Sequence, residues 1–223
     1  MRIAVAIPAY DAVQSVGSVV GRARAVIDDV LVIDDGSSDG TADAANAAGA
    51  EVHAFPANRG KGAALGAAFA ILFSRGFTAV VTVDADGQHL PEEIPRLLAV
   101  APDADLVLGT RDHLFAEMGI VRRFSNGLSS RAISWAAGQP IADVQTGFRL
   151  YSRELIERTG FPESGFEAES AVVVRAVRRG LRVTATPIRL GQADGRGTSH
   201  YRPIPDSLRI ATGVLRARFG SAG

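Results

Sequence analysis

Phe77-Thr78-Ala79-Val80-Val81-Thr82-Val83-Asp84-Ala85-Asp86-Gly87-Gln88 is the stretch that decides the fold class of this chain. Its first part, Phe77–Val83, is an apolar run typical of a buried strand, and the acids that follow it belong to a loop. Pro91-Glu92-Glu93 comes next and favours the start of a helix, with proline near the first helical position and acids in the first turn. The order of strand, acidic loop and helix indicates a βα unit.

The loop itself predicts a metal site. Asp84 and Asp86 are spaced i, i+2 where the strand ends, so their carboxylates can turn toward one point, and Gln88 adds an amide oxygen. Oxygen ligands of this kind suit Mg²⁺ or Mn²⁺, which commonly share the phosphates of a substrate. The alternative interpretation is a solvated acidic loop, and the rest of the chain has to decide between the two.

The same alternation of strands and helices runs through the first half of the chain. Short apolar runs predict strands, and the amphipathic stretches between them predict helices. This pattern is typical of an α/β fold with a mainly parallel central sheet flanked by helices. The predicted strands are Ile3–Ile7, Val30–Ile33, Glu51–Phe55, Phe77–Val83 and Asp105–Leu108, and the predicted helices are Val13–Ile27, Thr41–Ala48, Gly62–Arg75 and Pro91–Val100.

Polar loops follow several of these strands. In an open α/β sheet, ligands bind at the carboxyl ends of the strands. Ala9-Tyr10-Asp11, the Asp34–Gly40 loop and the Asp84–His89 loop should therefore converge on one edge of the sheet. Within the second of these, the sequence predicts helix capping by Ser38 or Asp39 and contact of Asp35 with a ligand.

The second half of the chain is less regular. It predicts helices over Arg122–Ala137, Glu167–Arg179 and Ile204–Phe219, a turn or edge strand over Val144–Tyr151, and a strand over Leu181–Leu190. We expect one domain over residues 1–203. The basic amphipathic helix in residues 204–223 is either part of that domain or peripheral to a membrane.

Composition narrows the classes of function. The 223 residues carry 24 basic and 24 acidic side chains, so no overall charge directs the protein to nucleic acid. The absence of cysteine excludes disulfides, thiolate metal sites and a cysteine nucleophile, and it fits a cytoplasmic location. No apolar run is long enough to span a membrane, and the N-terminus reads as a first strand rather than a signal peptide. Nothing in the sequence indicates an oligomeric state.

Two further segments suggest anion binding. Asn58-Arg59-Gly60-Lys61-Gly62 precedes a predicted helix, where glycines allow close approach of an anion to the backbone. Its glycine spacing matches neither a dinucleotide-binding nor a P-loop fingerprint. Gly109-Thr110-Arg111 follows the fifth predicted strand, where the guanidinium of Arg111 could bind a diphosphate through two hydrogen bonds. The alternative interpretation is that Arg111 is a surface residue without a ligand.

Taken together, these motifs resemble the family-2 glycosyltransferases, which have the GT-A fold of nucleotide-diphospho-sugar transferases. Within that family the chain is most similar to the dolichyl- and polyprenyl-phosphate sugar synthases, of the dolichyl-phosphate mannosyltransferase type. The resemblance covers roughly residues 2–200. The matching segments are Ile7–Tyr10, Val32–Thr41, Asn58–Gly62, Asp84–His89 with its Asp-x-Asp pattern, Gly109–Arg111 and Thr146–Arg149.

The resemblance implies a role for each matching position. Pro8, Tyr10, Ile33 and Asp35 would hold the nucleoside. Asp84, Ala85 and Asp86 would meet the ribose and the diphosphate, with the metal on this loop and Gln88. Arg111 would bind phosphate, beneath a closing loop at Gly197-Thr198-Ser199-His200. The donor-binding set is completed by Lys61, Arg149, Arg196 and His200.

Three positions depart from the family pattern. Ala12 stands where an acid is usual, Asp194 where an arginine is expected, and His200 where the closing loop usually has lysine. Since histidine is only partly charged at neutral pH, we expect a grip on phosphate that weakens as His200 deprotonates.

The implied reaction is inverting transfer of a sugar from a nucleotide-diphospho-sugar to a polyprenyl phosphate, assisted by Mg²⁺ or Mn²⁺ and by Asp86, at the cytoplasmic face of a membrane. A lipid phosphate needs no general base, whereas a hydroxyl acceptor does. Asp143 is the predicted base, with Glu167 or Glu169 behind it. The alternatives are a soluble transferase with a small hydroxyl acceptor, a non-catalytic nucleotide-sugar-binding protein and a sugar-1-phosphate nucleotidyltransferase.

Overall fold

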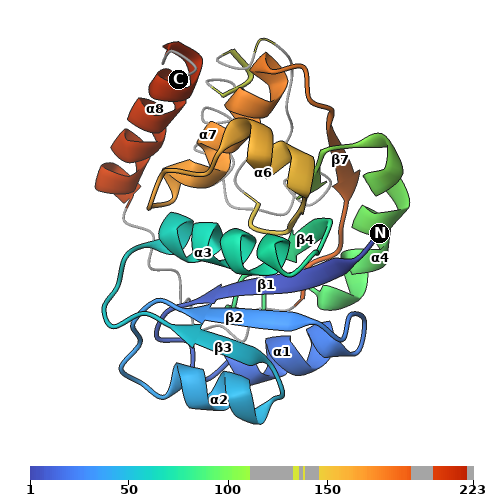
Figure 1. Cartoon of the computed structure of the whole chain (residues 1–223). Helices are drawn as coiled ribbons and strands as arrows, with labels where there is room; N and C mark the ends of the chain where they lie inside the picture. Colours follow the sequence, from blue (N-terminus) through green and yellow to red (C-terminus); the bar gives the residue numbers. More distant parts are fainter. Residues whose placement is uncertain (111–132, 136–137, 139–145, 192–202, 220–223) are drawn as a thin grey trace.

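A computed structural model of the chain describes residues 1–110, 133–135, 138, 146–191 and 203–219, with only the backbone described over 203–208 (Figure 1). Strands and helices alternate through the first half, as the sequence predicts. In chain order the elements are β1 (Ile3–Ala9), α1 (Val16–Arg24), β2 (Val30–Asp34), α2 (Thr41–Ala47), β3 (Glu51–Ala54), α3 (Lys61–Ser74), β4 (Ala79–Thr82), η1 (Pro91–Glu93), α4 (Ile94–Val100), η2 (Ala101–Asp103), β5 (Leu106–Thr110), β6 (Arg149–Ser152), α6 (Arg153–Thr159), α7 (Glu167–Arg178), β7 (Val183–Pro187) and α8 (Pro203–Phe219).

The strands form one seven-stranded sheet in the order β3-β2-β1-β4-β6-β5-β7. Four of the strand pairs are parallel, and the two pairs that β6 makes, with β4 and with β5, are antiparallel. The prediction of a mainly parallel sheet is therefore confirmed. The prediction of a turn or edge strand over Val144–Tyr151 is wrong for β6, which lies in the interior of the sheet with Arg149, Leu150 and Tyr151 fully buried.

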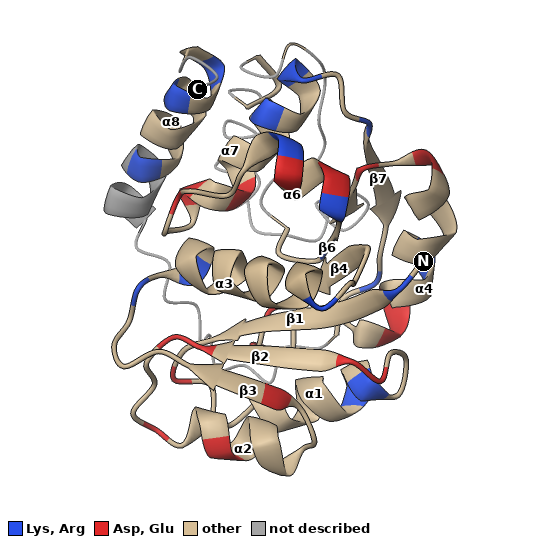
Figure 2. Cartoon of the chain, in the orientation of Figure 1, with Lys and Arg blue, Asp and Glu red and all other residues tan. Residues whose placement is uncertain are grey.

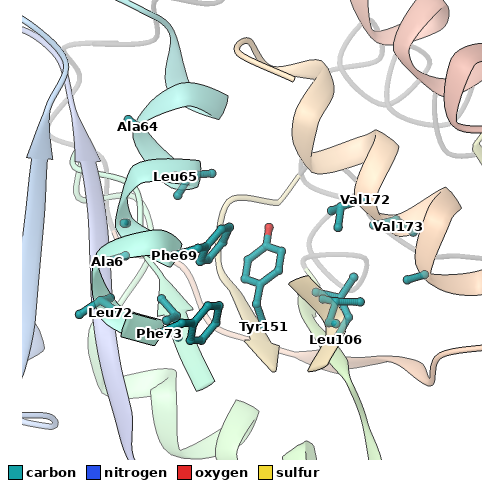
Figure 3. Packing of buried hydrophobic residues seen from close by; sticks show 14 of the residues in the cluster. Ala6, Ala64, Leu65, Phe69, Leu72, Phe73, Leu106, Tyr151, Val172 and Val173 are labelled. Carbon is teal, nitrogen blue, oxygen red and sulfur yellow. The ribbon is translucent and has the colours of Figure 1, made fainter. Parts of the chain in front are cut away.

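Side chains on the two faces of the sheet belong to two separate apolar clusters. On one face, α3, α6, α7 and α8 cover Val80 of β4 and Tyr151 of β6. On the other face, α1, α2 and α4 cover the adjacent residues Val81 and Leu150. This alternation is what a period of two along a strand requires. Figure 3 shows the first cluster, in which the rings of Phe69 and Tyr151 lie 4.9 Å apart between centroids.

The C-terminal helix α8 packs beside α7. Ile210 and Val214 are buried on its inner face, while Leu215 and Phe219 are exposed by 46% and 69%. The helix is therefore amphipathic, as the sequence predicts, and part of its apolar surface faces solvent. Within the described residues, no helix has the length and apolarity needed to cross a membrane.

Candidate nucleotide-sugar site

A pocket of about 180 Å³ opens at the carboxyl ends of β1, β2 and β4. The loops after these strands meet there with the start of α3, as the parallel arrangement predicts. In Figure 2, acidic residues, coloured red, mark the end of β2 on this side of the sheet. The pocket is lined by Pro8, Ala9, Tyr10, Ala12, Asp35, Lys61, Ala64, Asp84, Ala85, Asp86 and Phe166. Most of the predicted donor-binding residues in the described part of the chain are thus brought together.

Hydrogen bonds join the loop after β1 to the loop after β2. Asp11, at a backbone φ of +45°, accepts from the amide of Ser38 at 3.0 Å and donates its own amide to Oγ of Ser37 at 2.9 Å. The next amide, that of Ala12, donates to Oγ1 of Thr41 at 2.8 Å. Asp39 accepts the amide of Thr41, the first residue of α2, at 3.0 Å. Asp39 therefore accepts a hydrogen bond from the first residue of α2, although Gly40 is the N-cap residue of that helix. Together, the other three hydrogen bonds fix the loop after β1 against the loop after β2.

Asp35 fixes a second loop against the pocket. Its two carboxylate oxygens accept the amides of Arg59 at 2.7 Å and Gly60 at 2.8 Å, immediately before α3. Burial raises the pKa of Asp35 above its ordinary value, and the two amides offset only part of that effect. The backbone of the loop before α3 therefore fixes the orientation of the Asp35 side chain at the edge of the pocket.

Lys61, the first residue of α3, lies between two carboxylates in a largely buried group of charges. Its Nζ is 2.7 Å from Oδ1 of Asp84 and 2.8 Å from Oε2 of Glu169 on α7. Burial alone would lower the pKa of Lys61, but the attraction of the two carboxylates is greater and holds that pKa above its ordinary value. The lysine therefore stays charged at neutral pH and ties the Asp84 loop to α7.

Asp84 is enclosed on its other sides as well. His89 Nδ1 lies 3.8 Å from Oδ2 of Asp84, and the imidazole stacks on the ring of Phe148 with 5.7 Å between centroids. Gly147 allows this packing, because a Cβ added there would lie 2.1 Å from Oδ2 of Asp84. The Asp84 carboxylate is thus held in one position by its surroundings.

The three predicted metal ligands differ in their contacts. Oδ1 of Asp84 is paired with Lys61, so a metal ion at Asp84 would compete with the ammonium group for this carboxylate. Asp86 also lines the pocket, and its Oδ1 accepts the amide of Gln88 at 2.9 Å. Gln88 itself does not line the pocket. No cluster of three or more His, Cys, Asp or Glu side chains suited to a metal occurs among the described residues. One carboxylate can still hold Mg²⁺ or Mn²⁺ if substrate phosphates and water supply the other ligands, so Asp86 fits this role.

Two other predicted residues lie away from the pocket. The side chain of Ile33 is fully buried in the apolar core, so it does not line the pocket. Arg149, predicted to bind the donor, does not line the pocket: it is fully buried, and its guanidinium donates to the carbonyls of Thr146 at 2.7 Å and Glu169 at 2.6 Å. Arg111, Asp143, Arg196 and His200 lie outside the described residues.

The structure also adds residues that the sequence did not place in the donor set. Phe166 lines the pocket from the segment before α7. Glu169, which the sequence predicts only as a second choice of base, is paired with Lys61 and lies 3.7 Å from Nε of Arg149, so it is a structural partner. An acid inside the apolar run Ala168–Val174 was a usable signal, since a buried acid usually has a cationic partner.

The sheet and the acidic pocket at its strand ends define an α/β protein of the GT-A class. Glucosyl-3-phosphoglycerate synthase from Mycobacterium tuberculosis, in complex with phosphoglyceric acid, superimposes with a TM-score of 0.77 at 22% identity, covering 97% of this chain and 80% of that one. A second structure of that enzyme, in complex with Mn²⁺, uridine diphosphate and phosphoglyceric acid, gives a TM-score of 0.76 at 21% identity, over 100% and 80% of the two chains.

The chain belongs to glycosyl transferase family 2, whose family model matches residues 4–160. Undecaprenyl-phosphate mannosyltransferase from Micrococcus luteus is 34% identical over 84% of this chain and 83% of its own length. Polyprenol monophosphomannose synthase from Mycolicibacterium smegmatis is 35% identical, over 84% and 76% of the two chains. The protein is therefore a glycosyltransferase, as its sequence motifs predict.

Proposed function

We propose that this protein transfers a sugar, with inversion at the anomeric carbon, from a nucleotide-diphospho-sugar to a polyprenyl phosphate. The observation that carries the proposal is the pocket in which Tyr10, Asp35, Asp84 and Asp86 meet. The names of the relatives at 34% and 35% identity support the polyprenyl phosphate as acceptor.

Each side of the pocket has a separate task in this reaction. Tyr10 and Asp35 would bind the nucleoside, with Asp35 held in place by the amides of the loop before α3. Asp84, fixed by Lys61, would orient the ribose and the diphosphate. Asp86 would hold the divalent ion, which when bound stabilises the negative charge on the departing diphosphate. The protein thus supplies a preorganised donor site rather than a covalent intermediate.

The acceptor determines whether proton transfer is needed. The oxyanion of a lipid phosphate is already ionised, so no base has to remove a proton from it. Glu169 is unsuited to such a task because Lys61 neutralises its carboxylate. The predicted base Asp143 would matter only for a hydroxyl acceptor.

A lipid acceptor also requires access to a membrane. We place the enzyme at the cytoplasmic face, in peripheral contact with the bilayer. Leu215 and Phe219 at the end of α8 are exposed, and so is Trp135 at 60%. Trp135 lies under the guanidinium of Arg218, 4.3 Å from its ring centroid. Aromatic side chains beside cations favour the interface between lipid and water.

The test is a transfer assay with GDP-mannose, UDP-glucose and UDP-N-acetylglucosamine, each with and without a polyprenyl phosphate and with Mg²⁺, Mn²⁺ or EDTA. We expect one donor to yield a prenyl-linked sugar in a metal-dependent reaction. Asp86→Ala should lower that rate by about a hundredfold or more, the scale seen when a group that stabilises developing charge is removed. Asp43→Ala is the matched control, because Asp43 is an exposed acid on α2. Full activity in Asp86→Ala, or no transfer to any prenyl phosphate, would refute the proposal.

A further inference from the structure

A second, larger groove lies between α7 and α8. Its volume is about 820 Å³, and the segment before α7 forms one end of it. It is distinct from the donor pocket: Phe166 lines the donor pocket, whereas its neighbour Glu167 lines the groove. The groove is lined by Pro162, Glu163, Ser164, Glu167, Arg175, Arg178, Arg179, Arg209, Thr212, Gly213, Arg216 and Ala217.

Arginine dominates the charge of this groove, although the chain as a whole is neutral. These arginines belong to α7, its C-cap residue Arg179 and α8, and Figure 2 shows basic residues on both helices. Arg175 is neutralised by Glu163, whose Oε2 accepts at 2.9 Å. Arg178, Arg209 and Arg216 are exposed, and their guanidinium groups make no ion pair or hydrogen bond with any residue that the structure describes. Three unpaired cations therefore share one concave surface.

Stabilisation of helix ends explains only part of this arrangement. Arg178 and Arg216 stand in the last turns of α7 and α8, where a cation interacts favourably with the helix dipole. Arg209 lies in the middle of α8 and has no such reason to be there. Cations on facing walls also repel each other, and an anion between them removes that repulsion.

We propose that the groove between α7 and α8 binds the phosphate or diphosphate group of an anionic ligand through Arg178, Arg209 and Arg216. The guanidinium group is planar and presents paired donors that match the oxygens of phosphate, so arginine suits this ligand better than a point charge would. The ligand is either a soluble phosphate compound or the headgroup of an anionic lipid, since both present the same oxygens to the arginines.

The experiment has one arm for each source of phosphate. In the first arm, pyrophosphate is titrated into the whole protein by calorimetry at low salt and in EDTA, so that a divalent ion cannot recruit it to the donor pocket. In the second arm, flotation compares phosphatidylglycerol vesicles with phosphatidylcholine vesicles. The variants are Arg178→Gln and Arg209→Gln. Arg24→Gln is the matched control, because Arg24 is an exposed arginine in the last turn of α1.

We expect binding in at least one arm. Each groove variant should weaken this binding about fivefold or more, which is the scale of one hydrogen bond to a charged group, and the control variant should leave it unchanged. Binding of pyrophosphate alone identifies a soluble ligand, and binding to phosphatidylglycerol vesicles alone identifies a lipid headgroup. The proposal is overturned if neither arm shows binding, or if Arg24→Gln weakens binding as much as the groove variants do. Thermal melts confirm that the variants are folded. Because the assay involves no sugar transfer, its outcome is independent of the proposed reaction.

Discussion

Replacing Lys61 by methionine should leave the protein folded but clearly less stable. The change keeps most of the side-chain volume and removes the ammonium that lies within 2.8 Å of both Asp84 and Glu169. Removing one partner of a buried ion pair costs about 3–5 kcal/mol, because the remaining charge is left uncompensated. Because the Asp84 side chain is one quarter exposed, water can solvate part of its uncompensated charge. We therefore expect a loss of stability at the lower end of this range, about 3 kcal/mol. For a chain of this size that loss lowers the melting temperature by about 6–12 °C.

The loss should also depend on pH, and its sign follows from the charges. In the wild type the pKa of Lys61 is raised, so its stabilising contribution is complete below the ordinary lysine value of 10.5 and is lost only as the pH rises through the raised value. In Lys61→Met, two carboxylates share one site, and their repulsion raises the pKa of at least one of them. Protonation of that carboxylate then removes the repulsion in the variant. The difference in free energy of unfolding between the wild type and Lys61→Met should therefore become smaller as the pH falls from about 8 to about 5.

Urea denaturation at these two pH values measures the deficit directly. Arg22→Met is the control, because the pair between Arg22 and Glu92 is much more exposed and should contribute only about 0–1 kcal/mol. The double variant Lys61→Met, Glu169→Gln should recover part of the loss, since it removes one of the two facing carboxylates. The reasoning fails if Lys61→Met costs no more than Arg22→Met, or if its cost is the same at both pH values.

Three smaller changes test other contacts. Gly147→Ala should cost about 1–3 kcal/mol, because the new Cβ would lie 2.1 Å from Oδ2 of Asp84, whereas Gly21→Ala meets nothing within 4 Å and should be neutral or stabilising in a melting experiment. Asp35→Asn should be less stable than the wild type by about 1–3 kcal/mol, because an amide group cannot accept both loop amides. The pKa of Asp35 is raised, so the wild type loses stability as its carboxyl group ionises, whereas the variant does not. The difference in stability between the two proteins, measured by urea denaturation, should therefore become smaller as the pH rises from about 4 to about 7. Ser152→Ala removes the side-chain acceptor that caps α6 and should lower stability by about 1 kcal/mol; an unchanged melting temperature would contradict the cap.

The regular first half of the chain was predictable because its information is local. The run Phe77–Val83 contains β4, Ala79–Thr82, and the loop after it lines the pocket. Parallel strands then dictate that the loops after β1, β2 and β4 meet at one edge. The sequence alone therefore predicts that Tyr10, Asp35 and Asp86 lie together, as they do in the pocket.

The charged centre of the site was not predictable in the same way. Lys61 was expected to meet an anionic donor, but its ammonium contacts a carboxylate from the loop after β4 and another from α7. The sequence predicts Arg149 in the donor-binding set, whereas antiparallel pairing of β6 with both of its neighbours buries this side chain. Both outcomes depend on residues distant in the sequence: a local pattern can indicate that a buried acid has a cationic partner, but it does not identify which residue that partner is.

The position of β6 also has a consequence for how the chain is made. On a ribosome, β4 and β5 emerge before β6, yet they are not neighbours in the sheet, and β6 fills the gap between them. Until Arg149–Ser152 have been synthesised, the growing chain carries two strand edges with unsatisfied backbone groups, which other chains can pair with. A fragment that ends after β5 should accordingly aggregate rather than fold, even though it contains every acidic residue of the donor pocket.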